Sequence, residues 1–91
     1  MNTILLSALM LATSAFAGSA TKYEKRVAAA KISIIEAINI AQKEKAGTAV
    51  SAELDDKRGA TIYEVEVLSG GKLFEIKLDA ASGKVLETKE D

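Results

Sequence analysis

The stretch Thr61-Ile-Tyr-Glu-Val-Glu-Val-Leu68, followed by Ser69-Gly70-Gly71 and then by Leu73-Phe-Glu-Ile-Lys-Leu78, decides the fold. Apolar and polar side chains alternate in both runs, so each predicts a strand with one apolar and one mostly charged face. The two glycines supply the positive φ that a tight turn between antiparallel strands requires. We therefore predict a β-hairpin whose inward side chains are Tyr63, Val65, Val67, Phe74, Ile76 and Leu78.

Two weaker strands flank this hairpin. Ala49 to Leu54 alternates less clearly, and we expect Val50, Ala52 and Leu54 to face inward, with a turn from Asp55 to Gly59. Lys84 to Thr88 predicts a short final strand after a turn that runs from Asp79 to Gly83. In that turn the Asp79 carboxylate can accept backbone amides, and Gly83 can adopt a conformation that other residues avoid.

One helix precedes the strands. Ser33 and Glu36 have the spacing of a capping box, so a helix should begin at Ile34. Apolar side chains then recur at helical spacing, and Gly47 is expected to end the helix in a left-handed conformation. The predicted fold is therefore α+β, with one helix packed on a three- to four-stranded antiparallel sheet. The apolar stripe of the helix comprises Ile34, Ala37, Ile38 and Ala41.

The first 17 residues are typical of a cleaved secretory signal. Ile4 to Leu11 is almost purely apolar, and Ala15-Phe16-Ala17 has the small-x-small pattern of a signal peptidase site. We expect cleavage between Ala17 and Gly18, which would place the protein in the periplasm or outside the cell. A permanent membrane anchor is the alternative, but the apolar run is shorter than the roughly 20 residues that a spanning helix needs. No Lys or Arg precedes the run, which departs from the usual signal design.

Residues 18–31 are expected to form a flexible lead-in, with at most one helical turn from Val27 to Ala30. Within the lead-in, Lys22, Lys25 and Arg26 form a basic cluster, with Glu24 among them. Contact with anionic lipid is one interpretation of this cluster. Three positive charges are too few for a strong electrostatic anchor, so we favour a solvated tail.

The composition excludes several kinds of chemistry. The chain has no His and no Cys, and Met1 and Met10 both lie in the leader. Zinc, copper, iron–sulfur and haem sites, and Ser-His-Asp or Cys-His catalysis, therefore lack their usual donors. Twelve basic and thirteen acidic residues give a net charge of −1, which makes nucleic acid an unfavourable partner. We predict no catalytic, cofactor-binding or metal-ligating residue.

Acidic residues in the predicted sheet offer one alternative to this exclusion. Asp55-Asp56 in the turn, and the glutamates at 64, 66 and 75, carry the oxygen ligands that Ca²⁺ prefers. They lack an EF-hand spacing, and no pocket is implied around the glutamates. A solvated turn and a charged sheet face are the favoured interpretation.

Three segments together resemble the PepSY domain, a module of thermolysin-like peptidase propeptides and of assorted exported proteins. They are the helix from Ile32-Ser33 to Ala41, the strand Tyr63-Glu64-Val65-Glu66-Val67, and the run from Phe74 to Asp79-Ala80 with Ser82-Gly83-Lys84-Val85. The resemblance covers Lys31 to Glu87 and implies a PepSY-like domain over residues 32–91. Ser82 replaces the usual Thr of the turn but keeps the hydroxyl.

The resemblance implies a non-catalytic protein that inhibits or regulates a peptidase or another envelope protein. We expect the motif residues to be structural: Ser33, Glu36, Tyr63, Val65, Val67, Asp79 and Gly83. Contact with a partner is expected at a sheet edge or at an outer apolar patch of Ile62, Leu68 and Leu73. A small-ligand or cation-binding accessory protein of the periplasm is the alternative, and self-association through an edge strand is also open.

Overall fold

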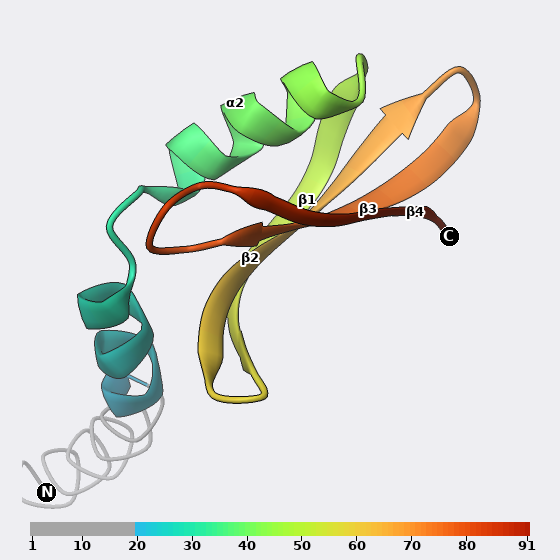
Figure 1. Cartoon of the computed structure of the whole chain (residues 1–91). Helices are drawn as coiled ribbons and strands as arrows, with labels where there is room; N and C mark the ends of the chain where they lie inside the picture. The colour runs from blue at the N-terminus through green and yellow to red at the C-terminus, as the bar shows by residue number, and fades with distance from the viewer. Residues whose placement is uncertain (1–19) are drawn as a thin grey trace, which may run out of the picture.

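A helix lies across one face of a four-stranded antiparallel sheet in the computed structural model, which describes residues 20–91 (Figure 1). The elements are α2 (Ile34–Glu44), β1 (Thr48–Lys57), β2 (Ala60–Ser69), β3 (Lys72–Asp79) and β4 (Val85–Glu90). The strands lie in the order β1-β2-β3-β4, so β1 and β4 form the two edges. This confirms the α+β fold. The expected cleavage between Ala17 and Gly18 lies outside the described residues.

The capping box at the start of α2 is present as predicted. The Ser33 hydroxyl accepts the Glu36 amide at 3.1 Å, and the Glu36 carboxylate accepts the Ser33 amide at 3.3 Å. The prediction that Gly47 ends the helix in a left-handed conformation is wrong, because Gly47 is not among the residues with positive φ. A Cβ at Gly47 would instead collide with the Leu68 carbonyl oxygen. Glycine therefore allows the chain after α2 to pass closely over the end of β2.

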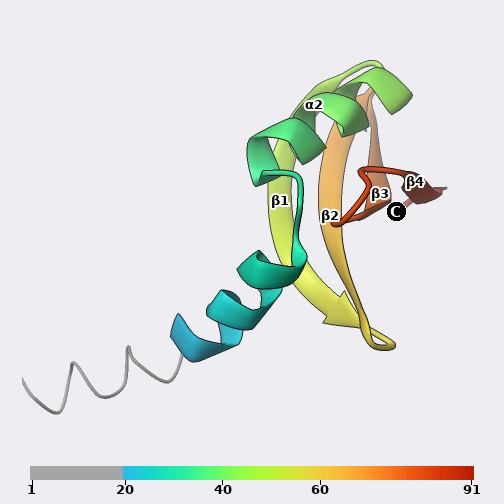
Figure 2. The same ribbon diagram turned by 60° about the vertical axis from the view of Figure 1, so that its left-hand side comes forward.

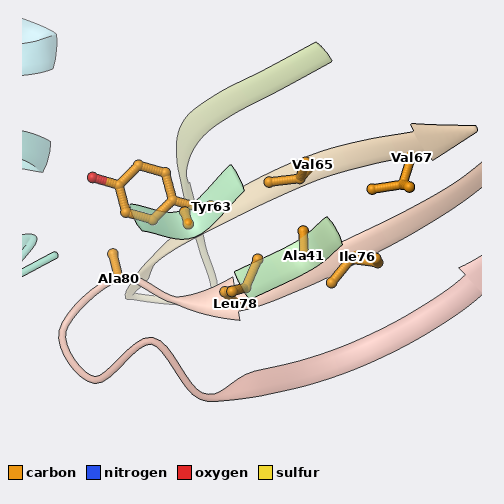
Figure 3. Packing of buried hydrophobic residues seen from close by; sticks show 8 residues of the cluster. Ala41, Tyr63, Val65, Val67, Ile76, Leu78 and Ala80 are labelled. Atoms are coloured by element: carbon orange, nitrogen blue, oxygen red, sulfur yellow. The ribbon is translucent and has the colours of Figure 1, made fainter. Parts of the chain in front are cut away.

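The core lies between α2 and the two central strands (Figure 3). Two alanines, Ala37 and Ala41, are fully buried on α2, and their small side chains let the helix approach the sheet. The inward residues of the predicted hairpin supply most of the remaining volume. The other buried members of the cluster are Tyr63, Val65, Val67, Ile76, Leu78 and Ala80.

Each edge strand contains a β-bulge. Ala49 pairs with Val67 and Ser51 pairs with Glu66, so Val50 has no partner and its side chain is 56% exposed. The prediction that Val50 faces inward is wrong, because strict alternation takes no account of an extra residue. Ala49 packs against the core in its place.

The bulge in β4 falls at Leu86. Leu78 pairs with Val85 and Lys77 pairs with Glu87, which leaves Leu86 between them without a partner. The Leu86 side chain is exposed. Bulges in edge strands disrupt regular pairing with other chains, so both edges of this sheet are poor templates along part of their length.

Two-residue turns close the first two hairpins. Gly70 and Gly71 both have positive φ, as predicted. Arg58 and Gly59 form the other turn, with φ of 53° and 80°. Asp55 and Asp56 therefore belong to β1 and not to the turn in which we expected them.

Residues 20–29 are helical, where the sequence predicted a flexible lead-in with one helical turn at most. Figure 2 shows this helix beside β1, separated from α2 by a short linker. Its only buried side chain is that of Arg26. The helical segment is therefore attached to the domain by a charged residue and not by an apolar face, which is why apolar periodicity gave no sign of it.

Candidate functional site at the edge of the sheet

Arg26 joins the helical residues 20–29 to β1. Its guanidinium donates to the Leu54 carbonyl at 3.0 Å and lies 3.4 Å from an Asp55 carboxylate oxygen and 3.3 Å from an Asp56 carboxylate oxygen. The Tyr23 ring lies 5.4 Å from the guanidinium carbon, within the range of a cation–π contact. Only 11% of the Arg26 side chain is exposed, so these three acceptors compensate a largely desolvated charge.

A groove of about 680 Å³ lies between residues 20–34 and the edge of the sheet. Tyr23 and Val27, one helical turn apart, contribute to its lining, and both side chains are substantially exposed. Ile34, Leu54 and Tyr63 also contribute, so apolar side chains come from the helix, the start of α2 and the sheet. The groove is therefore a mainly apolar depression next to an edge strand.

In the middle of this edge, outward backbone groups of β1 lack a hydrogen-bond partner among residues 20–91. Near one end, the Ala49 amide donates to the Gln42 side chain at 2.9 Å, and near the other end the Leu54 carbonyl accepts from Arg26. Both groups therefore point away from β2, and the alternation of an antiparallel pair makes Ala52 point outward as well. Among residues 20–91, no group donates to or accepts from the outward amide and carbonyl of Ala52.

An acidic hollow of about 270 Å³ borders the same stretch of β1 on the face of the sheet opposite α2. Four glutamates line it: Glu53, Glu64, Glu66 and Glu75. Ala52 and Glu53 line both the hollow and the apolar groove, so the two depressions meet where the edge of β1 is bare.

Lysines neutralise only part of the hollow. Lys57 lies 2.8 Å from Glu64, and this contact raises the pKa of Lys57 above its ordinary value. Lys77 lies 3.6 Å from Glu75. Glu66 accepts a hydrogen bond from the Ser51 hydroxyl at 2.5 Å, and Glu53 has no hydrogen bond or ion pair with any residue in the range 20–91. The hollow therefore keeps a net negative charge.

Asp79 and Gly83 shape the turn between β3 and β4. The Asp79 carboxylate accepts the Ser82 hydroxyl at 2.7 Å and the Ala81 amide at 3.4 Å, and these bonds hold the pKa of Asp79 below its ordinary value. Gly83 has a φ of 78°, and a Cβ there would lie 3.1 Å from the Ile40 side chain. The hydrogen bonds of Asp79 and the positive φ of Gly83 therefore explain, within the fold, why an aspartate and a glycine stand at these positions.

Tyr63 connects β2 to the linker before α2. Its hydroxyl donates to the Ile32 carbonyl at 2.7 Å, while its ring is buried in the core. Burial, assisted by the negative charge of Glu36, raises the pKa of Tyr63 above its ordinary value. The hydroxyl bond holds the linker that forms one side of the apolar groove.

The predicted patch of Ile62, Leu68 and Leu73 is not one surface. Leu68 pairs with Leu73 beside the Gly70-Gly71 turn, and Leu68 is 46% exposed. Ile62 is only 4% exposed and pairs with Asp79 instead. Six residues along a strand span roughly 20 Å, so Ile62 cannot join the other two.

Neither Arg26 nor Ala52 is predicted from the sequence to be part of a site. The available signal was the opposite charge of the 22–26 segment and of Asp55-Asp56, but the pairing joins residues 30 positions apart. Ala52 carries no chemical signal in its side chain. Ala52 belongs to the site because Gln42 and Arg26 bond to the backbone on either side of it and leave its own outward amide and carbonyl without a partner among the described residues.

No group of three or more acidic residues in the range 20–91 has the geometry to hold a metal ion. Within the same range, no helix has both the length and the apolar character that a membrane span requires.

Comparison with known proteins gave one family match and one similar solved structure. Residues 31–89 match the PepSY family, described as the peptidase propeptide and YPEB domain. The crystal structure of a proposed lipoprotein from Clostridium difficile 630 is similar, with 27% sequence identity and a TM-score of 0.63. The similarity covers 66% of this chain and 40% of that chain. A comparison with curated proteins found no match.

Proposed function

Since this chain belongs to the PepSY family, we propose that it is an exported, non-catalytic protein-interaction module that inhibits or regulates a peptidase or another envelope protein. PepSY domains are generally non-catalytic propeptide or regulatory modules. The observation that carries the proposal is the bare edge of β1 between the apolar groove and the acidic hollow. An edge strand with adjoining pockets is a known means of binding another polypeptide.

The ionisable groups also favour binding over catalysis. Among residues 20–91, the pKa values of Lys57, Tyr63 and Asp79 depart from their ordinary values. Each shift has a partner or burial within the fold as its cause, and only Tyr63 lines the apolar groove. A nucleophile with an adjacent base, which most covalent mechanisms require, is not formed by these residues.

An exported location is part of the proposal. The expected signal at residues 1–17 supports it, and so does the similarity to a proposed lipoprotein. The absence of cysteine is compatible with an oxidising compartment, because no thiol is exposed to disulfide exchange.

The direct test is capture of envelope proteins by the immobilised chain from Gly18 to Asp91. Mass spectrometry would compare the captured proteins with those retained by an unrelated domain of matched size and charge. Specific recovery of a peptidase, followed by reduced peptidase activity when the free chain is added, is the expected result. Recovery of a non-peptidase would remove peptidase regulation but keep the interaction module. Failure to recover any protein would contradict the proposal.

A small-ligand-binding accessory protein is the second candidate. The volume of the apolar groove falls within the roughly 300–1,000 Å³ of most small-molecule sites. A ligand that binds only the folded protein must raise the melting temperature. Thermal denaturation against a library of small apolar compounds tests the ligand form, and millimolar Ca²⁺ and Mg²⁺ test the cation form. An unchanged melting temperature in both series would count against this candidate.

A further inference from the structure

The bare part of β1 is short and is bounded by side chains at both ends. At one end the Ala49 amide donates a hydrogen bond to the Gln42 side chain, and Val50, which has no partner in β2, comes next. At the other end the Leu54 carbonyl accepts a hydrogen bond from Arg26. The outward backbone of Ala52 lies between these limits. A residue of an added antiparallel strand can accept from the Ala52 amide and donate to the Ala52 carbonyl at the same time, because opposed residues of such a pair exchange both hydrogen bonds.

The two depressions indicate which side chains such a strand would carry. Successive side chains of a strand point to opposite faces of its sheet. A strand added beside Ala52 would therefore place alternate side chains next to the apolar groove and next to the acidic hollow, which meet at Ala52 and Glu53. One set of positions favours apolar side chains, and the other favours the charge that complements the hollow.

That complementary charge is positive. Lys57 and Lys77 already pair with Glu64 and Glu75, whereas Glu53 has no partner among the described residues. Within residues 20–91, the one hydrogen bond of the Glu66 side chain is to the neutral Ser51 hydroxyl. A lysine or arginine from a partner would find two carboxylates without a basic neighbour.

We propose that the β1 edge at Ala52–Leu54 binds an extended segment of a partner polypeptide in which apolar residues alternate with lysine or arginine. The inference rests on the proposed function as an interaction module and names the chemistry of the segment that is recognised. The segment adds a strand to β1, its apolar side chains enter the groove and its basic side chains contact Glu53 and Glu66.

A second copy of this chain is a poorer occupant of the same edge. Glu53 lies on the open face of β1 without a basic partner among the described residues, so pairing of two β1 strands would bring their Glu53 carboxylates toward each other. The helical residues 20–29 of each copy would also lie beside the shared edge. We therefore expect the free chain not to pair through β1, and sedimentation of the free chain measures whether it does.

The test uses the synthetic peptide acetyl-Thr-Val-Lys-Val-Lys-Val-Thr-amide, titrated into the ¹⁵N-labelled chain from Gly18 to Asp91 and followed by NMR. We expect the amide resonances of Ala52 to Leu54 to shift, and the affinity to fall as salt is raised. The same peptide with glutamate in place of lysine should bind at least about tenfold more weakly. A peptide N-methylated at the amides that face β1 should lose binding, because the added strand can no longer donate.

The variant Glu53→Lys tests the charge of the hollow, and Glu44→Lys is its matched control on the exposed end of α2. Glu53→Lys should weaken binding of the lysine peptide about tenfold and strengthen binding of the glutamate peptide. Glu44→Lys should leave the affinity for both peptides unchanged. Three results would overturn the site: no shift at about 1 mM peptide, equal binding of the two peptides, or full binding of the N-methylated peptide. Dimers that form through β1 and exclude the peptide would also overturn it.

The same variants separate failure of the site from failure of the proposed function. A protein captured by the wild-type chain should be lost with Glu53→Lys and retained with Glu44→Lys. Equal capture by both variants would refute the β1 site while leaving the interaction module intact. Peptide binding without any captured protein would support the site but contradict the proposed function.

Discussion

Replacement of Arg26 by alanine should detach the helical residues 20–29 from the sheet while the core stays folded. Arg26 is the only buried side chain of that segment, and Tyr23 and Val27 are 46% and 62% exposed. The segment therefore has little buried apolar surface to hold it in place. Without the guanidinium, Asp55 and Asp56 would also lie close together with no positive charge between them.

The size of the effect follows from the contacts that are lost. A hydrogen bond from a charged donor, such as that from Arg26 to the Leu54 carbonyl, contributes about 1.5–3 kcal/mol. The two ion pairs contribute up to about 1 kcal/mol each and less where the carboxylates are exposed, as Asp56 is at 52%. We expect the docking to weaken by about 2–4 kcal/mol. Amide exchange in residues 22–29 should then accelerate at least about 30-fold, since every 1.4 kcal/mol is a factor of ten.

Hydrogen exchange by NMR measures this directly, because it reports each segment separately. Amides of Val65 and Ile76 in the core should keep most of their protection. Arg26→Lys should lie between wild type and Arg26→Ala, since lysine keeps the charge but cannot contact three acceptors in a planar fork. Lys25→Ala, an exposed neighbour, is the matched control. Unchanged exchange of residues 22–29 in Arg26→Ala would refute the assignment of Arg26 as the attachment.

Three further predictions concern the stability of the fold, each measured as the free energy of unfolding in urea. Tyr63→Phe should cost about 0.5–1.5 kcal/mol, because the Ile32 carbonyl loses its hydroxyl donor at 2.7 Å; an unchanged value would mean that water replaces the bond at no cost. Arg58→Asn should stabilise the chain by up to about 1 kcal/mol, because asparagine tolerates positive φ better than arginine; destabilisation would contradict this. The lowered pKa of Asp79 means that its contribution is present above the ordinary pKa of 3.8 and is lost as pH falls through the lower folded-state pKa. The difference in stability between wild type and Ser82→Ala should therefore be larger at about pH 6 than at about pH 2.5, and a constant difference would disprove the role of this hydrogen bond.

Local patterns predicted the parts of the fold whose causes are local. The Ser33–Glu36 capping box and the Gly70-Gly71 turn both depend on residues within three positions of one another, and both are present. The bulge at Val50 was not predictable, because a bulge changes which residues face inward without changing composition. Gly47 was misassigned because helix ends and close approaches of the backbone both favour glycine, and only the position of Leu68 distinguishes them.

The candidate site was less predictable than the fold, since its parts come from distant segments. A basic run in a lead-in is usually solvated, and nothing near Arg26 in the sequence shows that it contacts Asp55 and Asp56. The predicted patch failed for a related reason. Its residues share a face, but shared orientation does not make Ile62 a neighbour of Leu68.

Part of the β1 edge is covered by side chains and part can pair with another strand, and Arg26 determines how long the second part is. Bare edges invite pairing with any exposed strand, and here Gln42, the bulge at Val50 and Arg26 leave only a short window at Ala52. A short segment can pair within that window, whereas a longer one must compete with Arg26 for the Leu54 carbonyl. Binding of a long segment would therefore favour detachment of residues 20–29, and any change that detaches them would lengthen the available edge, because the two equilibria share one acceptor.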